Sequence, residues 1–167
     1  MKLEDVTSAR IEPINREDTS TIFKMVANTF SAHASVELVR QELTQNVDLD
    51  ISKKLVLGDK IIGAYLLGER DLFHFLQTNS AYCKVLLPPE DVKWLRGKRG
   101  VQGVALVVLP EYKGRGYGKQ LIDLPSQLGY DYIWGEQLKS LGNLHHWLKR
   151  RQLVADCSGV HVTMQKL

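Results

Sequence analysis

The sequence has no hydrophobic run that approaches the length of a membrane span, and it has only two cysteines among its 167 residues. Its first ten residues, MKLEDVTSAR, lack the apolar stretch of a secretory signal peptide. Cys83 and Cys157 show neither a CxxC pair nor the Cys/His spacing of a zinc site. We therefore expect a soluble, cytoplasmic protein without membrane or metal, with both cysteines in the reduced state.

A strong excess of charge of one sign is also missing. The formal net charge is +3, from 22 basic and 19 acidic side chains. This mild excess suits an anionic ligand, but it does not point to nucleic acid as a partner. Repeats, low-complexity tracts and obvious linkers are absent as well, and 44% of the residues are hydrophobic. Length and composition therefore predict a single domain over residues 1–167.

One stretch, residues 101–123, carries a pattern that points to a chemistry. An unbroken apolar run over residues 104–109 has the length of a buried strand and no helical period. Pro110 ends that strand, because proline cannot donate a ladder hydrogen bond. Gly114, Gly116 and Gly118 follow where a helix is expected to begin. The unpaired N–H groups of a helix N-terminus attract anions, so the stretch predicts a phosphate-binding loop.

Two common phosphate-binding motifs do not fit this loop. A Walker A motif requires glycine five positions before Gly118, and Ser or Thr after Lys119, whereas the sequence has Lys113 and Gln120 there. The dinucleotide fingerprint G-x-G-x-x-G meets Lys119 at the position of its third glycine. The spacing therefore disfavours both a P-loop and a dinucleotide-binding fold.

A third pattern fits. The stretch resembles the signature L-x-V-x-P-x-x-(Q/R)-x-x-G-x-(G/A) of the GNAT superfamily of acyl-CoA-dependent N-acyltransferases. The matching residues are Leu106, Val108, Pro110, Lys113, Gly116 and Gly118, with lysine in place of Gln or Arg. The resemblance is close over residues 101–128 and elsewhere rests on the order of elements. It implies an α/β (α+β) fold, with a mixed, mostly antiparallel sheet of roughly six to seven strands flanked by about four helices.

The predicted elements follow the GNAT order. Strands are expected at about residues 9–14, 51–57, 60–68, 104–109, 130–134 and 160–166. Helices are expected after Asn15, after Ser35, from the glycine loop to about Leu124, and over about residues 139–152. Lys149, Arg150 and Arg151 would lie in the last turn of that final helix, where positive charge offsets the helix dipole.

Residues 70–100 have no counterpart in this layout. GNAT strands three and four are joined by a short turn, whereas about thirty residues intervene here, and a loop of that length is functional or has its own structure. One interpretation is a small packed excursion, such as a dimer contact. The other is a wall or lid over the acceptor site. The sequence does not favour either.

The resemblance implies that acetyl-CoA binds along the strand and loop. The backbone of the strand would pair with the amides of pantetheine, and the loop would hold the pyrophosphate. The predicted cofactor-binding residues are Leu106, Val107, Val108, Lys113, Gly114, Arg115, Gly116, Tyr117, Gly118, Lys119 and Asn143. For the charged loop residues, the alternative is an ordinary solvated loop.

An amine acceptor must lose a proton before it attacks the thioester. The candidate bases are Glu69, Asp71, His74 and Glu136. Glu69 is preferred, because the third strand borders the acceptor side in the family. Each of these carboxylates could instead be a surface charge.

The leaving thiolate is where the sequence departs most from the family. Many GNAT enzymes protonate it with a tyrosine near the start of the last large helix, but no tyrosine follows Tyr132 here. His146, or its neighbour His145, could substitute, although ordinary helix surface or core packing is the favoured interpretation for both. We predict Glu69, His146 and Tyr132 as catalytic residues, with core or cleft lining as the alternative for Tyr132.

The sequence thus predicts an N-acetyltransferase that moves an acetyl group from acetyl-CoA to a primary amine by direct attack in a ternary complex. The alternative is a non-catalytic GNAT-fold module that binds acyl-CoA as a sensor or interaction partner. The acceptor, whether a small molecule or a peptide amine, cannot be identified from these residues, and a homodimer is compatible with them.

Overall fold

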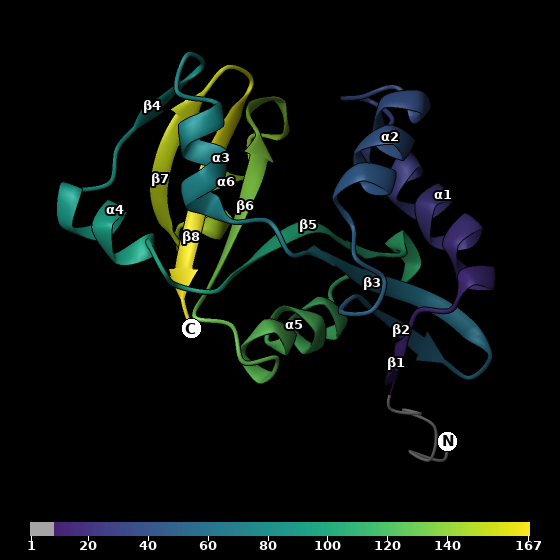
Figure 1. Cartoon of the computed structure of the whole chain (residues 1–167). Helices are drawn as coiled ribbons and strands as arrows, with labels where there is room; N and C mark the ends of the chain where they lie inside the picture. Colours follow the sequence, from purple (N-terminus) through teal and green to yellow (C-terminus); the bar gives the residue numbers. More distant parts are fainter. Residues whose placement is uncertain (1–8) are drawn as a thin grey trace. The chain divides into compact units, whose positions relative to one another are not determined.

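The computed structural model describes residues 9–167 and divides them into two compact units. Unit 1 comprises the described residues up to Leu67 together with Ala105–Leu124. Unit 2 comprises Gly68–Val104 and Pro125–Leu167. The described part of the chain has eight strands, in the hydrogen-bonded order β1-β2-β3-β5-β6-β8-β7-β4. One strand, β5 (Gly100–Val108), begins in unit 2 and ends in unit 1 (Figure 1).

Unit 1 contains a small antiparallel sheet and two helices that come early in the chain. Its remaining elements are β1 (Arg10–Pro13), α1 (Thr19–Phe30), α2 (Val36–Asn46), β2 (Lys53–Leu57), β3 (Lys60–Gly68) and α5 (Tyr117–Ile122). β2 pairs antiparallel with both β1 and β3. Two predicted helix starts are confirmed: a 3-10 turn, Arg16–Asp18, follows Asn15 and leads into α1, and the Ser35 side chain accepts a hydrogen bond from the Leu38 N–H at the start of α2.

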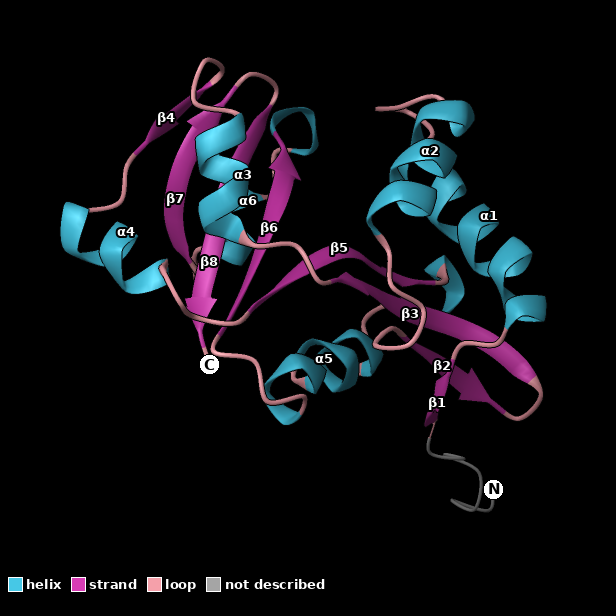
Figure 2. Ribbon diagram, viewed as in Figure 1, coloured by secondary structure: helices cyan, strands magenta, loops and turns pink. Residues whose placement is uncertain are grey.

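Unit 2 is built on the strands that follow in the chain. Its elements are α3 (Leu72–Thr78), β4 (Cys83–Val85), α4 (Pro89–Leu95), β6 (Tyr132–Leu138), α6 (Leu144–Trp147), β7 (Gln152–Cys157) and β8 (Val160–Lys166). β8 pairs antiparallel with β6 and β7, and β4 pairs antiparallel with β7 (Figure 2). β5 and β6 form a parallel pair.

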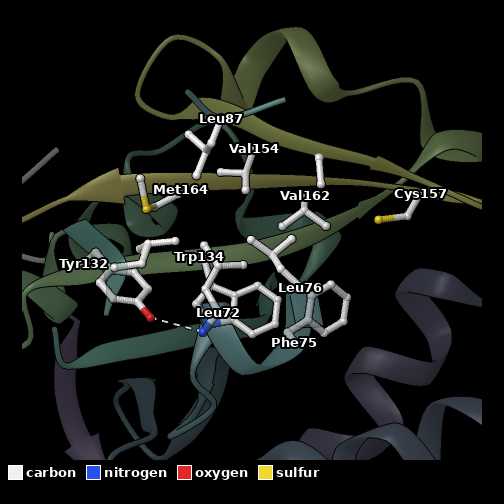
Figure 3. Close-up of a cluster of buried hydrophobic side chains, with 12 residues drawn as sticks. Leu72, Phe75, Leu76, Leu87, Tyr132, Trp134, Val154, Cys157, Val162 and Met164 are labelled. Atoms are coloured by element: carbon white, nitrogen blue, oxygen red, sulfur yellow. Dashed lines mark hydrogen bonds between the residues drawn. The ribbon is translucent and has the colours of Figure 1, made fainter. Parts of the chain in front are cut away.

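The inserted residues 70–100 belong to the core of unit 2. Side chains from α3 and α4, including Leu72, Phe75 and Leu95, are buried together with Trp134 of β6 and Met164 of β8 (Figure 3). The indole N–H of Trp134 also donates to the carbonyl oxygen of Arg70 at 2.8 Å. The segment is therefore packed against the sheet, which agrees with the first of the two interpretations; its predicted role as a lid over an acceptor site stays untested.

The C-terminal part differs from the sequence-based expectations in three places. The expected helix over residues 139–152 is replaced by a 3-10 turn, Lys139–Leu141, and the four-residue α6, because Gly142 adopts a left-handed conformation (φ +63°) that interrupts it. β7 was not anticipated, although the Ser158-Gly159 dipeptide is a hairpin turn signal before β8. The strand expected at 130–134 begins two residues later and continues to Leu138.

The two cysteines were expected to be reduced, but the structure joins Cys83 and Cys157 in a disulfide. They face each other across the antiparallel pair of β4 and β7, so strand pairing brings together two residues that are 74 positions apart. Intramolecular disulfides are rare in a reducing cytoplasm, so a cytoplasmic location stays a prediction. Within residues 9–167, no helix is long and apolar enough to cross a membrane.

Candidate functional site

The glycine loop at the end of β5 has a backbone that only glycine adopts easily. Gly114 and Gly116 have φ values of +77° and +84°, and Gly116 is the residue that precedes α5. A Cβ atom added at either position would meet nothing within 4 Å. The glycines are therefore required by backbone conformation, and the space above the loop is open to a ligand.

The loop also offers hydrogen-bond donors. The backbone N–H groups of Gly114, Arg115 and Gly116 donate to no other described residue, and those of the first turn of α5 have no intrahelical partner by the geometry of a helix start. Lys113, Arg115 and Lys119 are exposed, and none forms an ion pair within the described residues. Open N–H groups and cations on one loop suit a phosphate group.

The loop is held in place by the strands of unit 1. Val107 of β5 is buried, and its carbonyl oxygen would lie only 2.8 Å from a Cβ atom added at Gly63 of β3. The side chain of Val108, the last residue of β5, lies between β3 and the loop, 3.4 Å from a Cβ atom added at Gly63 and 3.9 Å from one added at Gly118. Gly63 therefore permits the close approach of β3 to β5 on which the loop rests.

β5 and β6 remain paired over only part of their lengths. Their parallel register covers three pairs of residues and ends at Gln102 opposite Trp134, although both described strands continue beyond this point. The printed register thus describes the part of β5 that belongs to unit 2 together with β6.

The predicted base Glu69 lies at the end of β3, in unit 2. Its Oε1 atom accepts a hydrogen bond from the hydroxyl of Tyr130 at 2.5 Å and one from the Arg99 guanidinium at 3.3 Å. The bond from Tyr130, followed by the bond and the charge of Arg99, holds the pKa of Glu69 below its ordinary value against the opposing effect of desolvation. The Glu69 side chain is 49% exposed, so an ionised carboxylate is accessible from solvent here.

The other candidate bases lie in different surroundings. Asp71 is the N-cap of α3, where its carboxylate accepts from the N–H of Phe73 at 2.8 Å. His74 is exposed on the same helix, and Glu136 is exposed on β6. Asp71 therefore has a structural role already, whereas Glu69 is distinguished by the tyrosine and the arginine that bind its carboxylate.

Tyr132 is buried in the core of unit 2 and shows no exposed surface. Its hydroxyl accepts a hydrogen bond from the N–H of Leu72 at 3.1 Å (Figure 3). The same hydroxyl donates one to Asp71 at 3.2 Å. Burial, with a smaller contribution from the negative charge of Asp71, raises the pKa of Tyr132. A buried, weakly acidic hydroxyl with both partners fixed is poorly suited to proton transfer, so we assign Tyr132 to the core.

The α6 region holds the remaining predicted residues. His145 and His146 are exposed, and their ring centroids are 4.0 Å apart. The Oδ1 atom of Asn143 is buried and has no hydrogen-bond partner among the described residues. An unsatisfied buried acceptor is costly, so Asn143 is available for a ligand that can donate a hydrogen bond.

Sequence reasoning missed two features of unit 2. Tyr130 and Arg99 surround Glu69, but they lie 61 and 30 positions from it, and no local pattern links them. Arg151 was expected on the exposed last turn of a helix, yet it is buried. The only sequence signal against a helix that extends to Arg151 was Gly142, which lies within the expected helix over residues 139–152.

Comparisons with known proteins place the fold. No protein-family model matches the sequence, and the comparison with curated proteins gave no significant match. Among solved structures, PaiA N-acetyltransferase from Thermoplasma acidophilum, in complex with coenzyme A, has a TM-score of 0.61 at 12% identity. Naa50 from Arabidopsis thaliana, in complex with the bisubstrate analogue CoA-Ac-MVNAL, has a TM-score of 0.60 at 11% identity.

A third solved structure, an acetyltransferase of the GNAT family from Staphylococcus aureus Mu50, has a TM-score of 0.64 at 10% identity. Each of the three alignments covers 96% of this chain and 99% of the other. These likenesses extend over nearly the whole chain, and they confirm the fold class expected from the sequence.

Proposed function

We propose that this chain, which has the fold of the GNAT superfamily, is an N-acetyltransferase that transfers the acetyl group of acetyl-CoA to a primary amine. The glycine loop carries the proposal, because its open N–H groups and unpaired cations fit a pyrophosphate. The structural neighbours support it at the level of the family: PaiA is bound to coenzyme A and Naa50 to a CoA–peptide analogue. A small-molecule or peptide amine is the corresponding acceptor here.

Each part of the site has a role in this proposal. The N–H groups and cations of residues 113–119 bind the pyrophosphate of acetyl-CoA. The backbone of β5 at Leu106–Val108 pairs with the pantetheine amides and directs an N–H group toward the thioester oxygen, where negative charge develops. Asn143 accepts a hydrogen bond from the same ligand. Glu69 takes the proton of the amine, directly or through water, as the amine attacks the thioester carbon.

A second candidate function is a module that binds acyl-CoA without transferring the acetyl group. The observation that favours it is the four-residue α6, which lies where many GNAT enzymes present an acidic tyrosine. Incubation of acetyl-CoA with a panel of amines, with free thiol as the readout, separates the two. Thiol release that depends on an amine supports transfer, and binding without release supports the module.

The first experiment is thermal unfolding with and without acetyl-CoA. At a hundredfold excess over Kd, a ligand stabilises the folded state by about 2.7 kcal/mol, which raises Tm by several degrees. Gly116→Glu should abolish this shift, since it places a carboxylate among the phosphate-binding groups.

Gly58→Glu is the matched control. Gly58 also has positive φ (+60°) and open space around its Cβ position, but it lies in the turn between β2 and β3. The Gly58→Glu variant introduces the same charge and the same backbone strain as Gly116→Glu. Its increase in Tm with acetyl-CoA should therefore equal that of the wild type. Absence of a shift in the wild type at millimolar acetyl-CoA would make the glycine loop a structural turn and end the proposal.

A further inference from the structure

Glu69 and Arg99 present opposite charges side by side on the surface of unit 2. The Nη2 atom of Arg99 lies 3.3 Å from Oε1 of Glu69, and the side chains of Arg99 and Glu69 are 65% and 49% exposed. An exposed ion pair of this kind contributes little to the free energy of unfolding, because solvent screens it and both side chains must be ordered to form it. Stability alone is therefore a weak reason for this arrangement.

Tyr130 holds both members of the pair in place. It is buried, and its hydroxyl donates to Oε1 of Glu69 at 2.5 Å. The guanidinium of Arg99 lies over its ring, 4.7 Å from the centroid, and the backbone N–H of Arg99 donates to the carboxylate of Asp131 at 2.7 Å. Charged groups that are ordered before a ligand arrives lower the entropic cost of binding that ligand.

The pair also keeps hydrogen-bonding capacity that the rest of the described chain does not use. Both hydrogen bonds that Glu69 accepts within residues 9–167 go to Oε1, so its Oε2 atom remains open. The Arg99 guanidinium contacts Glu69 through Nη2, and no other carboxylate among the described residues pairs with its side chain. A carboxylate oxygen and several guanidinium N–H groups are therefore exposed next to each other.

These groups match the two charges of an α-amino acid. An ammonium group donates to a carboxylate, and a guanidinium binds a carboxylate through parallel N–H groups. Both charged groups of an α-amino acid are attached to one carbon atom, so they lie as close together as the side-chain charges of Glu69 and Arg99. A diamine would bring a second positive charge toward Arg99, and the N-terminus of a peptide has no carboxylate on that carbon.

We propose that Glu69 and Arg99 form a binding site for the zwitterionic end of an α-amino acid, with its ammonium group on Glu69 and its carboxylate on Arg99. The ligand completes a closed arrangement of alternating charges on the surface of unit 2. The inference rests on the proposed function in one respect, which is that the bound amino acid is the acceptor of the acetyl group. Binding itself requires only residues of unit 2 and no cofactor.

Binding of amino acids in the absence of acetyl-CoA tests the inference. The common L-amino acids are each added at millimolar concentration to the wild-type protein, and binding is detected by saturation-transfer NMR. The tightest binder is then compared with its own amide, which lacks the negative charge, and with the carboxylic acid that lacks the amino group. The amino acid should bind at least tenfold more tightly than either analogue, because each analogue leaves one charged side chain without a partner.

Arg99→Met should abolish the preference for the amino acid over its amide. Arg96→Met is the matched control, because Arg96 is also exposed, its guanidinium also lies over an aromatic ring, that of Phe73 at 5.3 Å, and it forms no ion pair within the described residues. The control should bind the amino acid as the wild type does. An equal loss of affinity in the two variants would overturn the assignment of the carboxylate to Arg99.

The outcomes separate this inference from the proposed function. If no amino acid binds, or if the amide binds as tightly as the amino acid, the inference fails. The proposed function still stands in that case when acetyl-CoA binds and other amines are acetylated. If an amino acid binds with the expected preference but acetyl-CoA does not bind, the site stands and the proposed function fails. The comparison of ligands needs only the wild-type protein, so it decides the matter even if Arg99→Met does not fold.

Discussion

The hydroxyl of Tyr130 and the carboxylate of Glu69, 61 positions apart in the sequence, are joined by a hydrogen bond of 2.5 Å in which Tyr130 is the donor. Arg99 binds the same oxygen, and its guanidinium lies 4.7 Å from the centroid of the Tyr130 ring. The three side chains therefore form one cluster that favours the ionised form of Glu69 and lowers its pKa. An ionised carboxylate can accept a proton, and the cluster fixes its orientation.

Replacing Glu69 by glutamine should lower kcat at least tenfold, because the amide cannot accept the amine proton, while the Kd for acetyl-CoA should not change. Steady-state kinetics and a thermal shift with acetyl-CoA measure the two quantities. Glu90→Gln, which neutralises an exposed carboxylate on α4, is the control and should behave as wild type. An unchanged rate for Glu69→Gln would remove Glu69 from the mechanism.

Tyr130→Phe should raise the pKa of Glu69 toward its ordinary value, since the bond from Tyr130 is the largest cause of the lowered pKa. A base must be ionised to act, so the acidic limb of the pH–rate profile should move to higher pH in the variant. Titration of the Glu69 carboxyl carbon by NMR gives the same quantity without turnover. Tyr82→Phe, at an exposed tyrosine of unit 2, should leave the pH–rate profile and the pKa of Glu69 unchanged. An equal shift in that control would count against a specific effect of the Tyr130–Glu69 hydrogen bond.

A second carboxylate makes the stability of unit 1 depend on pH. Lys54 binds Asp18 at 2.6 Å, with side chains that are 10% and 16% exposed, and this bond is the largest cause of the lowered pKa of Asp18. The folded carboxyl group titrates below the unfolded one. The pair therefore stabilises the protein above the unfolded pKa, and this contribution is lost as the pH falls through the folded pKa.

Asp18→Asn should accordingly lower the free energy of unfolding by about 3 kcal/mol at neutral pH, because Lys54 is left buried without its partner. Urea unfolding measures the loss, and the difference from wild type should shrink in acid. Glu111→Gln breaks the exposed pair with Lys60, in which the atoms are 3.7 Å apart, and should cost less than about 1 kcal/mol. If the two variants lost equal free energy of unfolding, burial of the Lys54–Asp18 pair would not be the reason for its contribution.

Loss of the disulfide should destabilise unit 2. A crosslink between residues 74 positions apart is worth about 4 kcal/mol in the loop-entropy model. The double variant Cys83→Ala/Cys157→Ala should unfold at a correspondingly lower urea concentration, and wild-type protein in excess reductant should behave in the same way. If reductant has no effect on the wild type, the cysteines are not joined in the isolated protein.

The features that sequence reasoning predicted are local ones. Pro110, the alternating glycines and the apolar run before them lie within a few residues of one another, so their spacing alone specifies a strand, a turn and a helix start. The cap at Ser35 is equally local. The roles of such residues follow from backbone conformation and do not depend on distant parts of the chain.

The features that were missed depend on long-range pairing. A helix was expected over about residues 139–152, but Gln152–Cys157 pairs with β8 as a strand instead. Arg151, which precedes β7, lies near Gly135 of β6, and the pairing of β7 with β4 brings Cys157 to Cys83. A single sequence carries no spacing signal for contacts of this kind.

The disulfide has a consequence for protein that has been cut by a protease. Along the sequence, Cys83 comes before the turn at Gly97 and the glycine loop, and Cys157 comes after them. A single break of the backbone anywhere between Cys83 and Cys157 leaves two fragments that are still covalently linked. A nicked sample would migrate as one species on a non-reducing gel and as two fragments after reduction, so a single non-reduced band is no proof of an intact chain in this protein.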